Sequence, residues 1–436
     1  MKKITQAAIY LAIGLALPMT AQATDGYFSH GYGLKSKGMG GAATALAQDS
    51  IGGANNPASM VWAGNRMDLG VDWFRPERDA ERSGAGIPPI NGKVDSGREN
   101  FFIPEFGYNY MYSSDSSLGI TVYGNGGMNT SYPQGSFQCP DSPTTFAPAN
   151  ILCGGGSVGV DLSQLIIAPT AAYKINPDHA IGAALLFGYQ RFKAEGLQAF
   201  NNPPGFPPFT GAPGSVTNNG YDSSTGYGIR IGYMGKISDK VSIGAAYASK
   251  MKMGEFNKYK GLFAENGGFD IPENYSLGVA FAALPGMTVA LDYQRISYSK
   301  VASIGNSSAN QAPLGAANGP GFGWQDVDVV KLGVDYKMDS QLTLRGGYNH
   351  SSNPIRSQDV SFNILAPGVV QSHYTLGMTY APSKDNEITA ALMYAPRETV
   401  SGPSFLNSPA LFNGAGGNET IGMSQSSFGV AWGKKF

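Results

Sequence analysis

The chain closes with Ser427-Phe428-Gly429-Val430-Ala431-Trp432-Gly433-Lys434-Lys435-Phe436, and this stretch decides the fold. Phe428, Val430, Trp432 and Phe436 fall on one face of an extended strand, and small or polar residues fall on the other. A strand of a membrane β-barrel has this pattern, because one face meets lipid and the other faces the lumen. From these residues alone, the half-buried last strand of a soluble β protein is the alternative.

The amino end has the layout of a cleavable export signal. Lys2 and Lys3 precede an apolar stretch at residues 7–17, and Ala21-Gln22-Ala23 forms an A-x-A cleavage site, so the mature chain is expected to start near Thr24. The competing interpretation, an anchoring helix, would need about 20 apolar residues. An export signal together with a final aromatic residue predicts an outer-membrane barrel of a Gram-negative bacterium. Phe436 is then expected to be the signal that the barrel assembly machinery recognises.

Composition supports this class and excludes others. Only 14% of the residues are charged, whereas the chain holds 60 glycines and 11% aromatic residues, which suits many turns and aromatic girdles. The 30 basic and 31 acidic residues nearly balance, and no basic tract offers a nucleic-acid surface.

Alternation of apolar and polar residues recurs along the mature chain and predicts fourteen strands. They are placed near 66–75, 100–112, 117–132, 163–175, 179–196, 224–237, 240–254, 270–284, 286–305, 324–338, 341–352, 370–381, 386–402 and 421–436. Tight and long connections alternate strictly between them. Successive antiparallel strands then collect the short turns at the periplasmic rim and the long loops outside the cell.

Two stretches depart from this simple pattern. Residues 181–189 are apolar on both faces, so part of the lumen is expected to be apolar. Residues 24–65 show no sustained alternation but are rich in small and apolar residues, which favours a plug folded inside the barrel over a disordered leader. The expected division is a signal peptide at 1–23, a plug at 24–65 and an all-β transmembrane barrel at 66–436.

Several short motifs resemble the FadL/TodX-type outer-membrane transporters of long-chain fatty acids and hydrocarbons. The most specific is Asn56-Pro57-Ala58, which stands where that family has an Asn-Pro-Ala motif in its amino-terminal hatch. Further matches follow in the family's order: residues 31–43, Ile271-Pro272-Glu273, Leu291-Asp292-Tyr293, residues 342–348 and Asn353-Pro354-Ile355. Together they span nearly the whole mature chain.

The resemblance implies a monomeric 14-stranded barrel plugged by the hatch, and an unusual route through it. A ligand is captured near the external loops, enters an apolar pocket by the hatch and leaves sideways through a gap made by a kinked third strand. Asn125-Gly126-Gly127 is matched to that kink, because glycine inside a strand commonly marks a bulge or bend. The hatch near Asn56 is expected to pair with the freed backbone groups. A tight turn between two shorter strands is the alternative.

For ligand recognition, the resemblance carries over Arg191, in Tyr189-Gln190-Arg191-Phe192-Lys193, as the partner of a fatty acid carboxylate. The alternative is a rim arginine that reaches lipid headgroups. Fatty acid transporters of the family also carry a lysine before the position of Trp324, whereas residues 316–323 contain no basic residue. This difference leaves an uncharged hydrocarbon open as the ligand.

Cys139 and Cys153 lie in a loop rich in Pro, Ser and Gly, and in an exported protein they are expected to form a disulfide. The four histidines are scattered and none lies near the two cysteines, so neither a metal site nor a cofactor is expected.

Facilitated diffusion of a hydrophobic compound is the leading function, with no enzymatic activity expected, because the chain lacks a nucleotide-binding loop and a Gly-x-Ser-x-Gly elbow. The expected partners are that ligand, outer-membrane lipid and lipopolysaccharide. A general small-solute porin is the runner-up. An outer-membrane lipid hydrolase, for which Asn349, His350 and Ser351 are the only local candidates, is a distant third.

Overall fold

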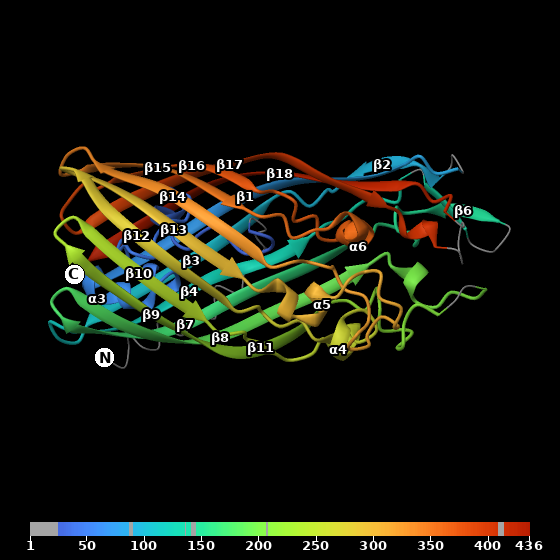
Figure 1. Cartoon of the computed structure of the whole chain (residues 1–436), viewed down its shortest axis with the longest axis horizontal. Helices are drawn as coiled ribbons and strands as arrows, with labels where there is room; N and C mark the ends of the chain where they lie inside the picture. The colour runs from blue at the N-terminus through green and yellow to red at the C-terminus, as the bar shows by residue number, and fades with distance from the viewer. Residues whose placement is uncertain (1–24, 87–89, 136, 141–144, 206–207, 409–413) are drawn as a thin grey trace.

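The structure is a computed structural model that describes residues 25–86, 90–135, 137–140, 145–205, 208–408 and 414–436. The expected signal peptide and Thr24 lie outside the described residues. Figure 1 shows an elongated barrel of tilted strands, with the carboxyl end and the short turns at one rim and long excursions at the other. Among the described residues, no helix is both long and apolar enough to cross a membrane.

Fourteen antiparallel strands form the closed wall, which confirms the predicted number. Each pairs with its neighbour in the chain, β18 pairs with β1, and β9 pairs with β10, so the sheet has no open end. The wall strands are β1 (Arg66–Ser83), β3 (Phe101–Met111), β4 (Ser116–Asn129), β7 (Gly159–Asn176), β8 (His179–Glu195), β9 (Asp222–Ser238), β10 (Val241–Ala248), β12 (Asn274–Leu284), β13 (Met287–Ile296), β14 (Val327–Lys337), β15 (Leu342–Ser351), β16 (Ser372–Tyr380), β17 (Asn386–Pro403) and β18 (Asn418–Lys435).

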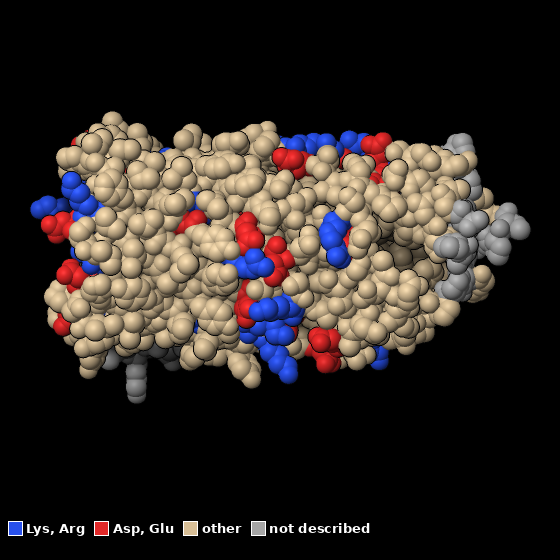
Figure 2. Space-filling model, in the orientation of Figure 1, with Lys and Arg blue, Asp and Glu red and all other residues tan. Residues whose placement is uncertain are grey.

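Alternating burial along each strand shows which residues face outward. In β8, Ile181, Leu185 and Phe187 are exposed, whereas Ala184 and Leu186 between them are buried. These exposed apolar side chains indicate that the outer face contacts lipid, because contact between apolar surface and water is unfavourable. Figure 2 shows the result, a broad band almost free of charge between charged groups at the short-turn rim and a second charged zone about halfway along the molecule.

The loop side is elaborated with short elements that fold over the barrel mouth. They are the strands β2 (Gly92–Asp95), β5 (Phe137–Pro140), β6 (Phe146–Ala149) and β11 (Lys252–Met253), the helices α4 (Ala264–Gly267), α5 (Ala302–Gly305) and α6 (Val360–Asn363), and the single-turn helices η4 (Gln198–Phe200), η5 (Asn257–Tyr259), η6 (Tyr298–Lys300), η7 (Ser357–Asp359) and η8 (Phe405–Asn407).

β1 and β13 differ most from the predicted bounds. β1 continues to Ser83 instead of ending at residue 75, since β18 pairs with its whole length and β2 pairs with Asp79–Arg82. Its charged upper half rises beyond the lipid band, where polar side chains are no longer disfavoured. β13 ends at Ile296 instead of residue 305, because Tyr298–Lys300 and Ala302–Gly305 turn into η6 and α5.

Residues 25–65 form α2 (Leu34–Lys37), η1 (Gly52–Ala54), η2 (Pro57–Ser59) and α3 (Met60–Ala63) and contact strands on every side of the wall. Small residues allow these close approaches. A Cβ atom at Gly182 of β8 would lie 2.5 Å from Ala58 N, and one at Gly244 of β10 would lie 2.0 Å from Thr44 O. Two buried ion pairs attach the same segment to the wall on the side away from β8 and β10. Lys37 pairs with Asp72 of β1 at 2.8 Å, and Lys35 pairs with Glu387 of β17.

Candidate functional site

An apolar pocket lies under the loops. Two small cavities, of about 10 and 20 Å³, share four lining residues, Leu262, Leu314, Phe362 and Leu365. The first also touches Leu152 and Phe405, and the second is bounded by Phe192, Phe263 and Phe322. These residues form the loop pocket. Each cavity as it stands has room for about one water molecule, so a ligand would have to displace loop side chains.

Aromatic rings continue from the loop pocket toward the amino-terminal segment. Phe192 lies 4.6 Å from Phe263 between ring centroids, Phe263 lies 4.9 Å from Phe269, and Phe269 lies 6.2 Å from Tyr27. Phe322, Trp324 and Tyr298 join the same group, with Trp324 6.0 Å from Tyr27. This aromatic cluster is a contiguous set of packed rings from the loops to Tyr27.

Beside Tyr27 the barrel wall is interrupted. β3 and β4 form ladder pairs only from Met111–Ser117 to Phe106–Val122. Above that point no ladder pair joins the described residues Phe101–Glu105 of β3 to Tyr123–Asn129 of β4. The register of β4 against β7 shifts between Gly124 and Gly126, which makes Asn125 an extra, bulged residue. Residues 101–105 pair with β1 and residues 123–129 pair with β7, but not with each other, and these two stretches together form the wall break.

The amino-terminal segment supplies hydrogen bonds to the break. Phe28 forms a β-bridge with Gly126, Ser29 N donates to Asn125 O at 3.3 Å, and Gly127 N donates to Tyr27 O at 3.3 Å. Only glycine fits at position 126, because a Cβ atom there would lie 1.8 Å from Tyr27 O. The bulge and residues 27–29 are therefore built to fit each other.

Side chains secure the same contact. Tyr32 Oη donates to Asn125 Oδ1 at 3.0 Å, and Asn125 Nδ2 donates to Gln164 Oε1 at 3.0 Å. Tyr298 Oη accepts from the backbone N–H groups of Tyr27 and Phe28 at 3.1 and 3.2 Å. The Asn125 side chain thus links the amino-terminal segment to β7, and Tyr298 links the aromatic cluster to the same segment.

The expectation that residues near Asn56 would satisfy the kink is wrong. Asn56 Nδ2 donates to Thr44 O at 2.8 Å and to Tyr233 O of β9 at 2.9 Å, while Asn56 Oδ1 accepts from Ala58 N at 3.0 Å. Asn56 caps the turn that begins at Pro57 and fixes it against β8 and β9. The motif Asn56-Pro57-Ala58 therefore attaches the segment to the wall, and residues 27–29 contact the kink.

The structure does not bring Arg191 into the interior. Gln190 and Phe192 are buried and face inward, whereas Arg191 shares the outward row of β8 with Phe187 and Tyr189. Its guanidinium lies 4.7 Å from the ring centroid of Tyr221. This placement corresponds to the rim arginine that the sequence left open as the alternative, because consecutive strand residues point to opposite faces.

The interior instead contains cations that the sequence did not single out. Seven of them donate hydrogen bonds or form ion pairs: Lys35, Lys37, Arg66, Arg82, Arg230, Lys331 and Arg345. Arg78 of β1 is also buried, yet its Nε and Nη2 atoms have no hydrogen-bond partner, and it forms no ion pair within 4.0 Å among the described residues. Sequence patterns did not single out Arg78, because the first strand was expected to end at residue 75, before Arg78.

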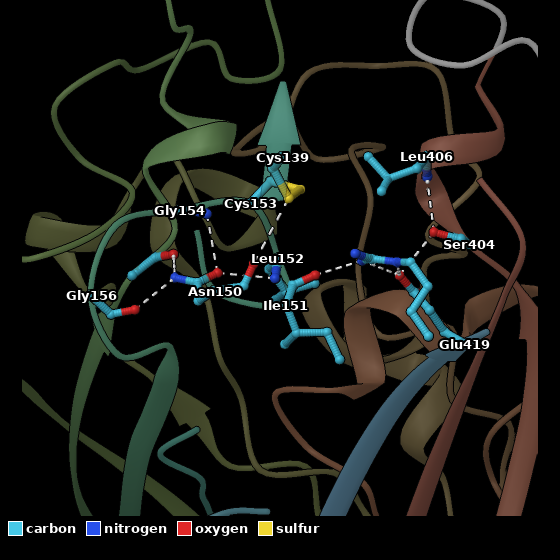
Figure 3. Close-up of a disulfide and its surroundings, with 12 residues drawn as sticks. Cys139, Asn150, Ile151, Leu152, Cys153, Gly154, Gly156, Ser404, Leu406 and Glu419 are labelled. Atoms are coloured by element: carbon cyan, nitrogen blue, oxygen red, sulfur yellow. Dashed lines mark hydrogen bonds and ion pairs between the residues drawn. A yellow bond between two sulfur atoms is a disulfide. The ribbon is translucent and has the colours of Figure 1, made fainter. Parts of the chain in front are cut away.

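The loop region is held together by two polar centres and a disulfide (Figure 3). Cys139 and Cys153 are joined, with their Cα atoms 5.4 Å apart. Asn150 Oδ1 accepts from Leu152 N and Gly154 N at 2.9 and 3.1 Å. Glu419 of β18 pairs with Arg82 and accepts from Ser404 Oγ at 2.9 Å. These contacts set the positions of Leu152 and Phe405 in the loop pocket.

The residues considered for a hydrolase are not assembled as a catalytic site. His350 and Ser351 are consecutive strand residues, with His350 exposed and Ser351 buried. His350 Nδ1 lies 3.1 Å from Ser372 Oγ on the outer face. In the described part of the chain, no Asp, Glu or Asn is bonded to this histidine to orient it, which a serine nucleophile with a histidine base requires.

Comparison with known proteins gives a family and a fold. A family model described as outer membrane protein transport protein (OMPP1/FadL/TodX) matches residues 21–403. A crystal structure of the Pseudomonas putida toluene transporter TodX is similar at 21% identity and a TM-score of 0.68, covering 95% of this chain and 100% of that one. No curated protein sequence matches the chain.

Two further solved structures have the same fold. The Ralstonia pickettii toluene transporter TbuX matches at 18% identity and a TM-score of 0.62, covering 93% of this chain and 99% of that one. A Pseudomonas aeruginosa FadL homologue matches at 14% identity and a TM-score of 0.66, covering 94% and 100%.

Proposed function

Because the chain belongs to the OMPP1/FadL/TodX family of outer-membrane transport proteins, we propose that it carries long-chain fatty acids or hydrocarbons into the cell by facilitated diffusion. The family and the barrel fold place it in the outer membrane of a Gram-negative bacterium, with hydrophobic compounds as the broad class of substrate. The family consists of transport channels rather than enzymes.

The observation that carries the proposal is the contiguous apolar packing, which we propose as the ligand's path. It begins in the loop pocket, follows the aromatic cluster from Phe192 to Tyr27, and ends at the wall break between β3 and β4. A ligand that took this path would pass from the external loops to the hydrocarbon layer without crossing the water-filled periplasm. Lateral exit through the break is the mechanism we propose.

The energetics favour passive movement. Burial of an alkyl chain gains about 0.8 kcal/mol per methylene, so an apolar path competes with the membrane itself and needs no external energy source. Entry requires side chains of the loop pocket to move, and exit requires residues 27–29 to leave the bulge. In this mechanism residues 27–29 exchange between a state bound to the bulge and a state released from it, and ligand binding shifts that equilibrium toward release.

Residues 24–65 act in this proposal as the hatch. The described part, from residue 25, is held by buried ion pairs to β1 and β17 and by Asn56 to β9, so most of it stays attached when residues 27–29 move. Removal of those few residues from the bulge is a small rearrangement compared with expulsion of the whole segment.

The surroundings follow from the fold. Ion pairs at the loop ends of β12, β13 and β14, such as Arg295 with Asp328 at 2.8 Å, lie just beyond the apolar band and suit lipopolysaccharide headgroups. A hydrogen bond from Lys300 lowers the pKa of Glu273 in the same zone.

Phe436 is the proposed recognition signal for barrel assembly. The closed wall leaves no sheet edge that would need a second copy, which fits a monomer.

Uptake by whole cells tests the function. A host without its own hydrophobic-compound transporter would express the chain, and uptake of radiolabelled oleate, toluene and a small sugar would be measured at matched surface abundance. The proposal predicts faster uptake of oleate or toluene and no change for the sugar. Increased sugar uptake alone would favour the porin.

A further inference from the structure

Arg78 differs from every other buried cation of the described chain in having no partner. Its side chain projects from the inward row of β1, it is 6% exposed, and both Nε and Nη2 are buried without a hydrogen bond. A buried guanidinium without an anion is costly, since a desolvated charge normally needs a paired counter-charge. Its guanidinium carbon lies 5.6 Å from the ring centroid of Phe101, and the Glu99 carboxylate acts on it only from beyond ion-pair distance.

Arg78 stands at the inner side of the wall break. Phe101, over which it lies, belongs to the β3 stretch of the wall break. Arg78 also lines a cavity of about 10 Å³ together with Gly127, Met128 and Asn129 of the β4 stretch of the wall break. The guanidinium is thus placed where the proposed path leaves the barrel.

The same cavity joins the apolar path. Tyr27 and Trp324 of the aromatic cluster line it, and so does Ala366, which follows Leu365 of the loop pocket. Trp324 and Phe322 lie 6.3 Å apart between centroids and connect the two cavities. An elongated molecule with one polar end could therefore place that end at Arg78 and its apolar body along the cluster.

We propose that Arg78 is the binding site for the anionic head of an amphipathic ligand, a monocarboxylate whose tail occupies the aromatic cluster. The inference rests on the proposed function and specifies its substrate class. Guanidinium and carboxylate form two parallel hydrogen bonds, a geometry that a lysine ammonium cannot reproduce. The site favours a carboxylate over an alcohol or hydrocarbon of equal length, because only the carboxylate supplies the missing negative charge.

Equilibrium binding to the purified, full-length mature protein in detergent tests the proposal, with tritiated oleate and tritiated oleyl alcohol as probes. The test variant is Arg78→Met, which keeps the length of the side chain without its charge. Arg191→Met, an arginine on the outward row, is the matched control. A charged hydrogen bond contributes enough that its loss should raise the oleate Kd about tenfold or more, with the oleyl alcohol Kd within twofold of wild type.

Several outcomes would overturn the proposal. Unchanged oleate affinity in Arg78→Met would exclude Arg78 as the head site and leave hydrophobic transport standing. Equal weakening of both ligands would show that Arg78 only supports the fold. If Arg78→Met does not form a heat-resistant barrel, Arg78→Lys and Arg78→Gln are compared instead, because lysine keeps the charge and glutamine removes it. The proposal predicts that Arg78→Lys binds oleate more weakly than wild type and more tightly than Arg78→Gln. Wild-type protein that binds oleyl alcohol but not oleate would contradict the Arg78 site alone, whereas wild-type protein that binds neither probe nor toluene would contradict the proposed function itself.

Discussion

At the scale of residues, Gly126 has no room for a side chain. A Cβ atom there would meet Tyr27 O at 1.8 Å, so Gly126→Ala must push residues 27–29 off the bulge. The expected result is faster amide hydrogen exchange at residues 25–32 with an intact barrel. Gly346→Ala is the control, because its nearest neighbouring atom is 4.0 Å away. Unchanged exchange in Gly126→Ala would contradict the described fit.

This contact also changes how a valine pair at Gly126 and Gly127 should be interpreted. If the glycines only permitted the kink, larger side chains there would be expected to straighten β4 and seal the wall. In the structure, the substitution at 126 displaces the amino-terminal segment as well, so loss or gain of uptake could arise from either effect. A test of lateral exit therefore needs a change that leaves both glycines in place.

The ion pair between Lys37 and Asp72 gives a second prediction. Both side chains are almost fully buried, at 5% and 1% exposure. Asp72→Asn leaves a buried lysine without its anion, which costs about 3–5 kcal/mol. We expect residues 34–49 to become sensitive to protease in the folded barrel. Glu77→Gln, which removes an exposed pair with Arg75, should cost less than about 1 kcal/mol. Equal protease sensitivity of the two variants would refute the anchoring role.

At the scale of elements, the strand positions could be predicted well from alternation, since lipid forces one face of each strand to be apolar. The phase of β8 could not be predicted from the same pattern. Ala184 and Leu186 on its inner face are as apolar as Ile181 and Phe187 on its outer face, so the side on which Arg191 lies is not encoded locally. Resemblance to the family placed Arg191 inside, and the structure places it outside.

The end of β1 illustrates a different limit. Arg75-Pro76-Glu77-Arg78 predicts a loop, because charges and proline disfavour a membrane strand. Pairing with β18 extends β1 beyond the lipid band, where charged residues are not disfavoured. Arg78 was missed for this reason, and only the fold shows that it points inward beside the break. The partner of Asn56 was equally hidden, because 177 residues separate it from Tyr233.

The disulfide element yields a third prediction. Cys139→Ser with Cys153→Ser removes a cross-link between residues 14 apart in the sequence, a loop length for which about 3 kcal/mol of stabilisation is typical. Since Leu152 adjoins Cys153 and lines the loop pocket, the variant should bind oleyl alcohol several-fold more weakly. Peptide mapping of wild-type protein under non-reducing conditions should find the linked pair. Two free thiols in the mature protein would contradict it.

At the scale of the whole molecule, the alternation of tight and long connections predicts opposite sides for two surface positions. Gln311 lies in the long loop between β13 and β14, and Asp239 lies in the tight turn between β9 and β10. A membrane-impermeant maleimide should label Gln311→Cys in intact cells and Asp239→Cys only after lysis. The reverse result would invert the barrel in the membrane.

The central claim is that hydrophobic ligands leave through the wall break. A Cβ atom at Gly124 would lie 3.0 Å from Ile103 Cγ2, so a cysteine pair at 103 and 124 would place its Cβ atoms within roughly 4.5 Å, close enough for a disulfide. That bond would tie β3 to β4 across the break. Glycines 126 and 127 and their contacts with residues 27–29 stay unchanged.

The deciding measurement is oleate and toluene uptake by cells that carry Ile103→Cys with Gly124→Cys, in a background of Cys139→Ser and Cys153→Ser. Uptake is compared before and after mild reduction, with each single cysteine variant as control. The account predicts that the oxidised double variant transports neither probe and that reduction restores uptake, whereas the single variants are unaffected. Full uptake by the oxidised variant, with the cross-link verified by mass, would contradict lateral exit and favour a path along the barrel axis.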